Sequence, residues 1–255
     1  MKVDICIATK NSFSTLPILV NSIQSQLSKV NSELLIADGS SSDKTIEYLE
    51  KLDSCKIVSY ADNSPEEGLN KLIKFQPKNL KVIIGSDDWV SDDYLSSFAF
   101  EADKLQKKGI NKFILIPKFY KNIGGSFLKL DFPIPFFFLN FIGIGRGIGW
   151  GIFHKEGRNP LFSENLRIAS DYDYLLRCLR DKYYFKYVSC RYFHLKNGRS
   201  SKNWLLGLKE EREIGLKYKQ NIVQQILINL FFITKFFYKI VNKLIHLAKS
   251  SNNYY

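Results

Sequence analysis

The stretch that decides the fold is Ile83-Ile84-Gly85-Ser86-Asp87-Asp88-Trp89, in which a buried-strand pattern ends in two adjacent carboxylates. Upstream, Leu34-Leu35-Ile36-Ala37-Asp38-Gly39-Ser40 ends in the same way with one carboxylate. Acidic residues at the carboxyl ends of apolar strands occupy the position where open α/β sheets bind their ligands. An Asp pair in that position suits a divalent cation and, through it, phosphate oxygens. The two stretches together predict a nucleotide-linked substrate.

The pattern around these stretches predicts an α/β fold. Strands are expected at residues 3–8, 34–37, 56–60, 80–84 and 113–116, and helices at about 17–28, 43–52, 65–75 and 92–107. Strands that alternate with helices in this way favour a mostly parallel, doubly wound sheet. Beyond residue 117 the alternation stops, so the first 116 residues are expected to form the nucleotide-binding half of the molecule.

The charge of the chain favours an anionic partner. Lys and Arg number 37 against 25 Asp and Glu, which gives a formal net charge of +12. Such an excess attracts nucleic acid, acidic lipid or phosphorylated substrates. The last 35 residues hold four Lys and no acid among many Phe, Ile and Leu, a pattern that favours a membrane surface. We therefore expect no nucleic-acid partner, although charge alone leaves a nucleic-acid-binding module as an alternative.

The cysteines and the N-terminus bear on the cellular compartment. The four cysteines show no CxxC spacing and three of them sit in apolar runs, so we interpret them as reduced core residues in the cytosol. The chain enters a strand directly after Met1, without the basic and apolar regions of a secretory signal.

Two helices are expected after residue 203, a charged one at 204–219 and a largely apolar one at 221–249. The polar residues of the second fall along one side of a helix. Lys235 and Lys239 interrupt the apolar run that a membrane-spanning helix needs. We therefore predict an amphipathic helix in the membrane interface, with its basic edge toward anionic headgroups. A helix packed on the rest of the chain, or one that forms a homodimer, is the alternative.

Residues 131–151 form an unusual segment, in which Phe132-Pro133-Ile134-Pro135-Phe136 leads into glycines interleaved with Ile and Arg146. The two prolines argue against a continuous helix. The segment is either a hydrophobic loop packed against the domain or a surface that faces lipid or an acceptor, and the sequence leaves both open.

The acidic positions, taken in order, resemble those of the glycosyltransferase family 2 enzymes of the GT-A fold, especially bacterial O-antigen and exopolysaccharide glycosyltransferases. Residues 5–11 match the first strand and turn, 38–45 match Asp-Gly-x-Ser-x-Asp-x-Thr, and 85–88 match the metal motif called DxD. Residues 162–177 resemble the segment that carries the catalytic base. The resemblance covers roughly residues 3–200.

The resemblance implies roles for individual residues. Asp171 would deprotonate the acceptor hydroxyl, and Asp87 and Asp88 would hold Mg²⁺ or Mn²⁺ on the donor diphosphate. Residues implied in nucleotide-sugar binding are Ala8, Thr9, Asn11, Asp38, Lys71, Ser86, Asp87 and Arg199.

Other positions carry an alternative beside their functional interpretation. His194 would be a late metal ligand or else a structural histidine. Trp150 would stack on an acceptor sugar or else belong to the core, and Arg146 would touch a lipid diphosphate. Lys71 would approach the donor diphosphate or else be a solvated lysine of a helix.

The sequence also departs from the family pattern. Gly85 stands where the family often has an acid, so fewer protein groups would hold the metal. Ser170 precedes Asp171 where the family commonly has Glu, which removes a neighbour that would affect the pKa of Asp171. Asp173 is the second candidate for the base, although a residue two positions after Asp171 on a helix should face a different direction.

Transfer of a sugar from a nucleotide donor needs acidic residues in two separate roles. Displacement of a nucleoside diphosphate builds negative charge that a divalent cation stabilises, and inversion needs one carboxylate base beside the acceptor. A glycosidase would need two carboxyls facing each other across the bond.

We therefore predict an inverting, metal-dependent glycosyltransferase for surface polysaccharide. It would move a sugar, from a UDP-linked donor by preference, to a polyprenyl-diphosphate-linked oligosaccharide at the cytoplasmic face of the bacterial inner membrane. A GT-A domain is expected at 1–203, with nucleotide-binding (1–116) and acceptor (117–203) halves, and a membrane-associating extension at 204–255. The alternatives are a catalytically inactive scaffold subunit, or a nucleotidyltransferase or sugar-phosphate enzyme, whose usual Gly-rich phosphate loop is missing at residues 9–13.

Overall fold

The computed structural model describes residues 1–53, 55–59, 61–123, 126–129, 148–195, 203–218 and 222–251. Within them, nine strands form a single sheet with the order β3-β2-β1-β4-β8-β6-β9-β5, and β7 pairs with β6. The strands are β1 (Val3–Thr9), β2 (Ser32–Asp38), β3 (Cys55–Ser59), β4 (Leu80–Ile83), β5 (Asp88–Val90), β6 (Lys112–Ile123), β7 (Ser126–Lys129), β8 (Gly151–His154) and β9 (Tyr184–His194).

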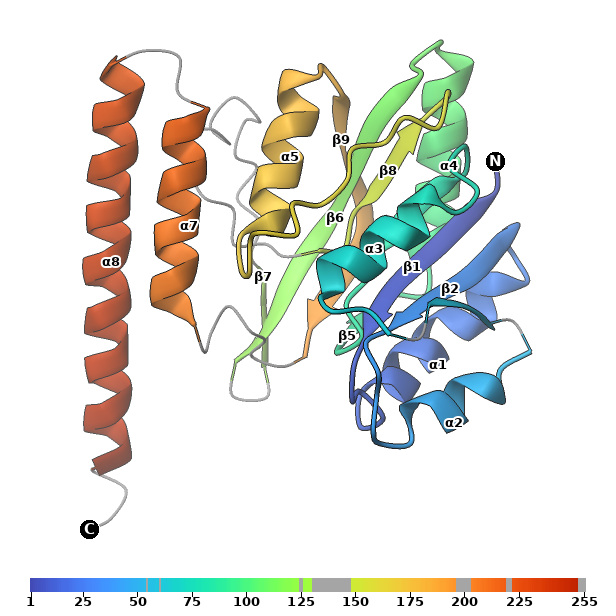
Figure 1. The fold of residues 1–255 in the computed structure, drawn as a ribbon, viewed down its shortest axis with the longest axis horizontal. Coiled ribbons are helices and arrows are strands. Elements are labelled where there is room, and N and C mark those ends of the chain that lie inside the picture. Colours follow the sequence, from blue (N-terminus) through green and yellow to red (C-terminus); the bar gives the residue numbers. More distant parts are fainter. Residues whose placement is uncertain are drawn as a thin grey trace.

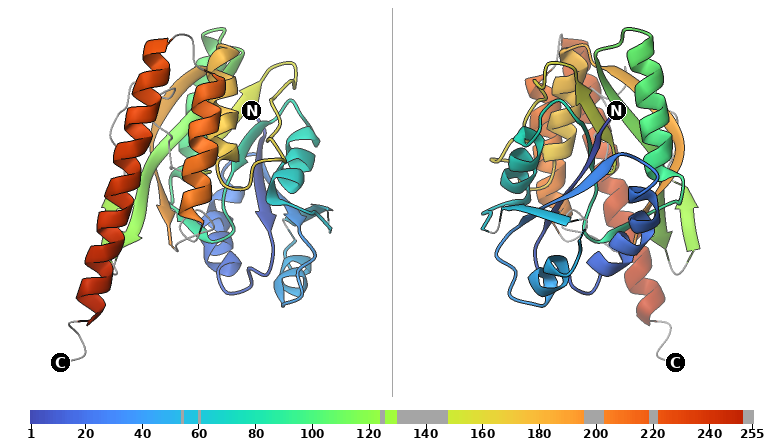
Figure 2. Two further views of the ribbon diagram at one scale, coloured as in Figure 1. Left: turned by 60° about the vertical axis from the view of Figure 1, so that its left-hand side comes forward. Right: turned by 90° about the vertical axis from the view of Figure 1, so that its right-hand side faces the viewer.

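Helices cover both faces of this sheet. The described helices are α1 (Leu16–Leu27), α2 (Thr45–Glu50), α3 (Pro65–Lys74), α4 (Tyr94–Lys107), α5 (Ser170–Arg180), α7 (Trp204–Lys217) and α8 (Ile222–Ser251). Figure 2 shows α1 and α4 on one face and α3 and α5 on the other. The α/β expectation and its mostly parallel sheet are confirmed, as is the GT-A architecture.

The first half of the sheet follows the predicted pattern. β1 pairs in parallel with β2 and with β4, and its residues Val3, Ile5, Cys6 and Ile7 are fully buried. A strand buried on both faces reads as a nearly continuous apolar run, which explains why the sequence locates it well.

The second half interrupts the parallel order. β8 inserts between β4 and β6 and is antiparallel to both, and β9 runs parallel to β6 on its other side. β6 extends to Ile123, so the boundary expected between residues 116 and 117 falls inside a continuous strand. The two halves therefore share one sheet and one hydrophobic core.

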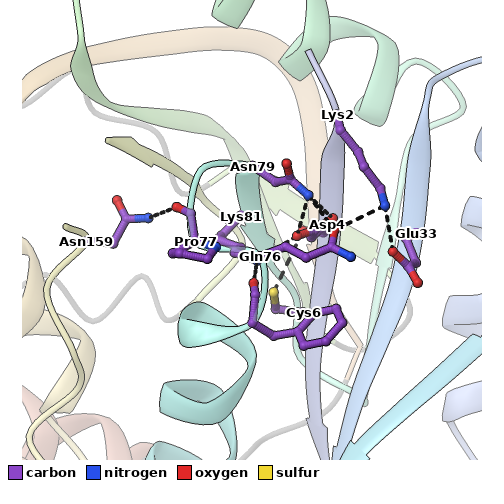
Figure 3. A network of polar contacts seen from close by, with 10 residues as sticks. Lys2, Asp4, Cys6, Glu33, Gln76, Pro77, Asn79, Lys81 and Asn159 are labelled. Atoms are coloured by element: carbon purple, nitrogen blue, oxygen red, sulfur yellow. Dashed lines mark hydrogen bonds and ion pairs between the residues drawn. The ribbon is translucent and has the colours of Figure 1, made fainter. Parts of the chain in front are cut away.

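A buried ion pair ties the beginnings of β1 and β4 together. Lys81 Nζ lies 2.6 Å from Asp4 Oδ2, and neither side chain is exposed to solvent. Asn79 Nδ2 donates to Asp4 Oδ1 at 3.0 Å (Figure 3). A buried pair of this kind is satisfied only when its remaining donors and acceptors are bonded, and Lys81 also donates to the carbonyl of Phe75.

The two C-terminal helices pack beside α5. α7 contacts α5 on one side and α8 on the other, and α8 runs past the end of α7 (Figure 1). Arg212 Nε on α7 donates to Asn229 Oδ1 on α8 at 2.8 Å, and Lys235 on α8 pairs with Glu211 on α7. Asn229 and Lys235 thus face α7, which corrects, for Lys235, the expectation of a basic edge turned toward anionic headgroups.

Candidate active site

A pocket lies where β1, β2 and β4 end. The loops after β1 and β2 are joined, because Ser12 N–H donates to Thr45 Oγ1 at 2.9 Å and Ser42 N–H donates to Asn11 Oδ1 at 2.8 Å. The hydroxyls of Ser12 and Ser86 lie 3.0 Å apart and connect these loops to the one after β4. The three loops enclose a cavity of about 580 Å³.

Five of the residues expected to bind a nucleotide sugar line this cavity. They are Ala8, Thr9, Asn11, Ser86 and Asp87. Thr9 is 5% exposed, and its hydroxyl has no hydrogen-bond partner among the described residues. A buried hydroxyl without a partner is costly, and a ligand group that reaches it would remove that cost.

Asp38 is not one of the residues that line the pocket. It is fully buried, and its two carboxylate oxygens accept from Ser41 N–H at 2.7 Å and from the Ser41 hydroxyl at 2.6 Å. In this arrangement Asp38 shapes the turn after β2. A direct contact with the base or ribose of a nucleotide would require that turn to open.

Asp62 lines the cavity, although the sequence analysis does not single it out. It is 8% exposed and pairs with Lys71, whose Nζ lies 2.6 Å from Asp62 Oδ1 and 2.9 Å from Glu67 Oε1. Lys71 therefore does not line the pocket itself, but it pairs with Asp62, which does. The signal that could have identified Asp62 is its position three residues after β3, at the same edge of the sheet as the other acids.

The adjacent carboxylates Asp87 and Asp88 have different surroundings. Asp87 lines the pocket, whereas Asp88 begins β5 and is paired with His194 of β9. Asp88 Oδ2 accepts from the Tyr192 hydroxyl at 2.6 Å, and Oδ1 lies 3.2 Å from His194 Nδ1. Asp87 lies in the turn before β5, so the two acids have different partners.

Gly85 allows this arrangement. A Cβ at this position would lie 2.6 Å from Asp88 Oδ2 and 3.3 Å from Asp87 Oδ1. Its N–H also donates to the Tyr192 hydroxyl at 2.9 Å. The acid that the family often has here would collide with the Asp88 carboxylate as it stands, so the departure from the pattern has a steric reason.

The residues at this edge of the sheet suit a divalent cation that takes one carboxylate from the protein and its other ligands from a bound phosphate and water. Among the described residues, no three His, Cys, Asp or Glu side chains gather as metal ligands. Asp87 supplies a carboxylate at the pocket, and Mg²⁺ characteristically takes one or two carboxylates together with phosphate oxygens and water. Asp88 and His194 contact each other, so a metal on Asp88 would compete with Tyr192 and His194.

Asp171 lies in the first turn of α5, away from the residues that line the cavity. Its Oδ1 accepts from Tyr172 N–H at 2.8 Å. Burial outweighs that hydrogen bond and, with the nearby charges of Glu211 and Glu66, raises the pKa of Asp171 to about 7. A carboxyl with this pKa exchanges its proton near neutral pH, as a general base should.

Ser170 brings a second acid close to Asp171. Its hydroxyl donates to Glu66 Oε1 on α3 at 2.9 Å, and Glu66 is 3% exposed. The sequence lacks an acid at position 170, but the fold supplies one from 104 residues away. Glu66 adjoins Pro65, which lines the cavity, and so connects the donor pocket to the region of Asp171.

Asp173 is held by hydrogen bonds from three neighbouring side chains, which indicates a structural role. It is 2% exposed and accepts from Ser163 Oγ at 2.6 Å, Arg177 Nε at 2.8 Å and Tyr218 Oη at 2.9 Å. Although burial acts to raise the pKa of Asp173, these hydrogen bonds and the Arg177 charge lower it overall. A buried, ion-paired carboxylate is poorly suited to take a proton, which leaves Asp171 as the candidate base.

The acceptor side is described only in part. Trp150 is 1% exposed and packs against Tyr174 and Phe162, with ring centroids 5.0 and 5.9 Å away. Trp150 therefore belongs to the core, and the expectation that it stacks on an acceptor sugar is corrected. Arg146 and Arg199 lie outside the described residues, as does most of the segment 131–151.

Comparisons with known proteins agree with this geometry. The family model described as glycosyl transferase family 2 matches residues 4–123, the part that holds the cavity-forming loops after β1, β2 and β4. No curated protein sequence matches the chain significantly.

Solved structures of S. aureus TarS share the fold. The structure of TarS 1–349 has a TM-score of 0.63 and 16% identity, and the match covers 91% of this chain and 71% of that chain. The complex of TarS 1–349 with UDP-GlcNAc has a TM-score of 0.66 with the same identity and coverage. Full TarS also gives 0.66, but the match covers 43% of its length. At this identity the likeness concerns the fold.

Proposed function

The chain belongs to glycosyl transferase family 2, and on this premise we propose that it is an inverting, metal-dependent glycosyltransferase that uses a UDP-linked sugar. The observation that carries the proposal is that the pocket and the candidate base lie in separate parts of the structure. A pocket at the strand ends contains Thr9 and Asp87, and a half-buried carboxyl with a pKa of about 7, Asp171, lies beyond it. The fold shared with TarS bound to UDP-GlcNAc supports a uridine nucleotide.

The roles of the residues follow from their chemistry. The loops after β1 and β4 bind the nucleotide and its diphosphate, and the Thr9 hydroxyl bonds to the ligand. Asp87 would hold Mg²⁺ or Mn²⁺, which when bound neutralises charge on the leaving diphosphate. Asp171 takes the proton from the acceptor hydroxyl that attacks the anomeric carbon. Asp88, held by Tyr192 and His194, fixes the chain that carries Asp87.

The test is release of UDP from UDP-sugars by the purified protein, with and without EDTA. We expect turnover that EDTA abolishes and that Asp171→Asn lowers by at least about 100-fold, as for loss of a general base. Below pH 7 the kcat of the wild type should fall about tenfold per pH unit, because Asp171 must be deprotonated. Full activity of the variant, or full activity in EDTA, would refute the mechanism.

We further propose that the acceptor is a polyprenyl-diphosphate-linked oligosaccharide of a surface polysaccharide such as O-antigen, at the cytoplasmic face of the inner membrane. The support is the exposed apolar outer face of α8, opposite the side on which Asn229 and Lys235 contact α7. None of the described helices has the length and apolarity needed to cross a membrane. The exposed residues of this outer face are Ile222, Val223, Ile226, Leu227, Leu230, Ile233, Phe237, Tyr238 and Val241.

The membrane proposal is tested by sedimentation with vesicles that contain phosphatidylglycerol. The wild type should pellet with these vesicles, and a variant with Leu230→Ser and Ile233→Ser should stay in the supernatant while retaining its UDP affinity. The matched control replaces Thr234, which is exposed on the same helix, with Ser. Equal sedimentation of wild type and variant, or a stable dimer on this face, would refute the proposal.

A further inference from the structure

A buried acid of α7 holds the loop that leads to the candidate base. Glu210 is 7% exposed although α7 belongs to the segment expected to be a peripheral extension. Its Oε1 accepts from Arg167 N–H at 2.9 Å, and its Oε2 accepts from Ile168 N–H at 2.8 Å and Ala169 N–H at 2.9 Å. Three consecutive backbone donors thus converge on one carboxylate.

These bonds satisfy the backbone of residues 167–169, the loop that ends at the N-cap of α5, and not the N–H groups of the helix itself. The first N–H groups of a helix have no partner within it, and a Ser, Thr, Asp or Asn side chain at the N-cap usually accepts from them. The N-cap residue of α5 is Ala169, which makes no such bond. Glu210 supplies the negative charge from another helix, at the end of α5 where the helix dipole favours an anion.

The close approach of α7 to this loop is built into the sequence. At Gly207, one turn before Glu210, a Cβ would lie 2.9 Å from Ile168 Cγ2. At the far end of α7, Tyr218 donates to Asp173 Oδ1 at 2.9 Å. The helix is therefore fixed to α5 and its preceding loop at two separate points.

The next residue of α7 extends the connection to α8. Glu211 pairs with Lys235 of α8, and it also lies near enough to Asp171 to raise the pKa of that carboxyl. Glu210 thus faces the loop before α5, while Glu211 lies between α8 and Asp171. The base, its loop and both C-terminal helices form one connected unit.

We propose that Glu210 is a positioning residue for glycosyl transfer, which orients Asp171 by fixing the backbone of residues 167–169. The inference rests on the proposed function, because it assigns the base role to Asp171. It makes α7 part of the catalytic unit, so α7 is more than a link to the membrane-associating helix.

The test compares Glu210→Ala with Glu213→Ala in the full chain. Glu213 is an exposed acid on the same helix and serves as the matched control. Displacement of a catalytic group by about 1 Å costs on the order of 100-fold in rate, so we expect kcat to fall by about 10- to 100-fold in Glu210→Ala. The KM for the UDP-sugar should stay within about twofold, since the donor pocket is untouched, and Glu213→Ala should behave as wild type.

A second readout does not depend on activity. Hydrogen exchange of the amides of residues 167–169, followed by mass spectrometry, should accelerate in Glu210→Ala and not in Glu213→Ala. Glu210→Gln keeps one acceptor oxygen and should restore part of both the protection and the kcat. Wild-type kcat in Glu210→Ala, or unchanged exchange, would overturn the inference. A wild-type protein that never releases UDP would instead refute the proposed function, and the role of Glu210 in catalysis with it.

Discussion

Replacement of the candidate base should stabilise the protein. In the folded chain the pKa of Asp171 is about 7, whereas an unfolded Asp titrates near ~3.9. Between these values the folded state binds more protons than the unfolded state, so the free energy of unfolding falls as the pH rises through this window. Asn carries no charge, and its amide oxygen can still accept the hydrogen bond from Tyr172 N–H. Asp171→Asn therefore removes the free-energy cost of keeping this carboxyl in the folded state, and that cost is largest above pH 7.

The size of this effect follows from the two pKa values. Each tenfold difference in proton affinity corresponds to about 1.4 kcal/mol, so the full penalty is about 4 kcal/mol. At pH 5 it is about 1.5 kcal/mol and at pH 8 about 4 kcal/mol, because the folded carboxyl is protonated at the lower pH. The stability gained by the Asn variant should thus grow by about 2.5 kcal/mol between these pH values, or roughly 5–10 °C in Tm for a chain of this size.

Asp173→Asn is the matched control on the same helix. The hydrogen bonds and the Arg177 charge that lower the pKa of Asp173 stabilise its ionised form in the folded state. A carboxyl of this kind contributes stability above its unfolded pKa and loses that contribution as the pH falls. Asp173→Asn should therefore destabilise the protein at pH 8, opposite in sign to Asp171→Asn.

The assay is urea unfolding of the wild type and both variants at pH 5 and pH 8, followed by circular dichroism. We expect Asp171→Asn to lie above the wild type and Asp173→Asn below it at pH 8. If Asp171→Asn gains no more stability at pH 8 than at pH 5, Asp171 titrates like an ordinary surface carboxyl. The argument that burial prepares it as a base would then be wrong.

Three further predictions concern the sheet and the pocket. Tyr192→Phe should lower the free energy of unfolding by about 1–3 kcal/mol in urea, because Gly85 N–H and Asp88 lose a buried partner. Gly85→Ala should weaken Mn²⁺-dependent UDP binding in calorimetry, since its Cβ displaces the Asp88 carboxylate; wild-type affinity would contradict this. Lys81→Met should cost about 3–5 kcal/mol in urea by leaving Asp4 buried without its partner, and adding Asp4→Asn should recover part of the loss.

The sequence locates what depends on local patterns. The strands that end near Thr9, Asp38 and Asp87 are buried on both faces, and their apolar runs reveal them without tertiary information. The family pattern adds the loops that follow them, and most residues assigned to the nucleotide do line one cavity. The two helices after residue 203 also occur at the expected positions.

The sequence does not reveal what depends on distant neighbours. Asp88 looks equivalent to Asp87 until β9 pairs with β5 and brings Tyr192 and His194 to it. Trp150 is an even choice between sugar and core until Tyr174 and Phe162 enclose it. Glu210 resembles any helical acid, because its partners lie more than 40 residues upstream. These roles come from packing between segments that no local pattern connects.

The central claim is that donor binding and proton transfer are carried out by separate groups, at the pocket and on α5. Calorimetric titration with UDP, in the presence and absence of Mg²⁺, tests it directly on the wild type, Asp87→Asn and Asp171→Asn. The account predicts Mg²⁺-dependent binding that Asp87→Asn weakens by about tenfold or more, which is about 1.4 kcal/mol, and that Asp171→Asn leaves unchanged. Equal loss of UDP affinity in both variants, or none in Asp87→Asn, would contradict it.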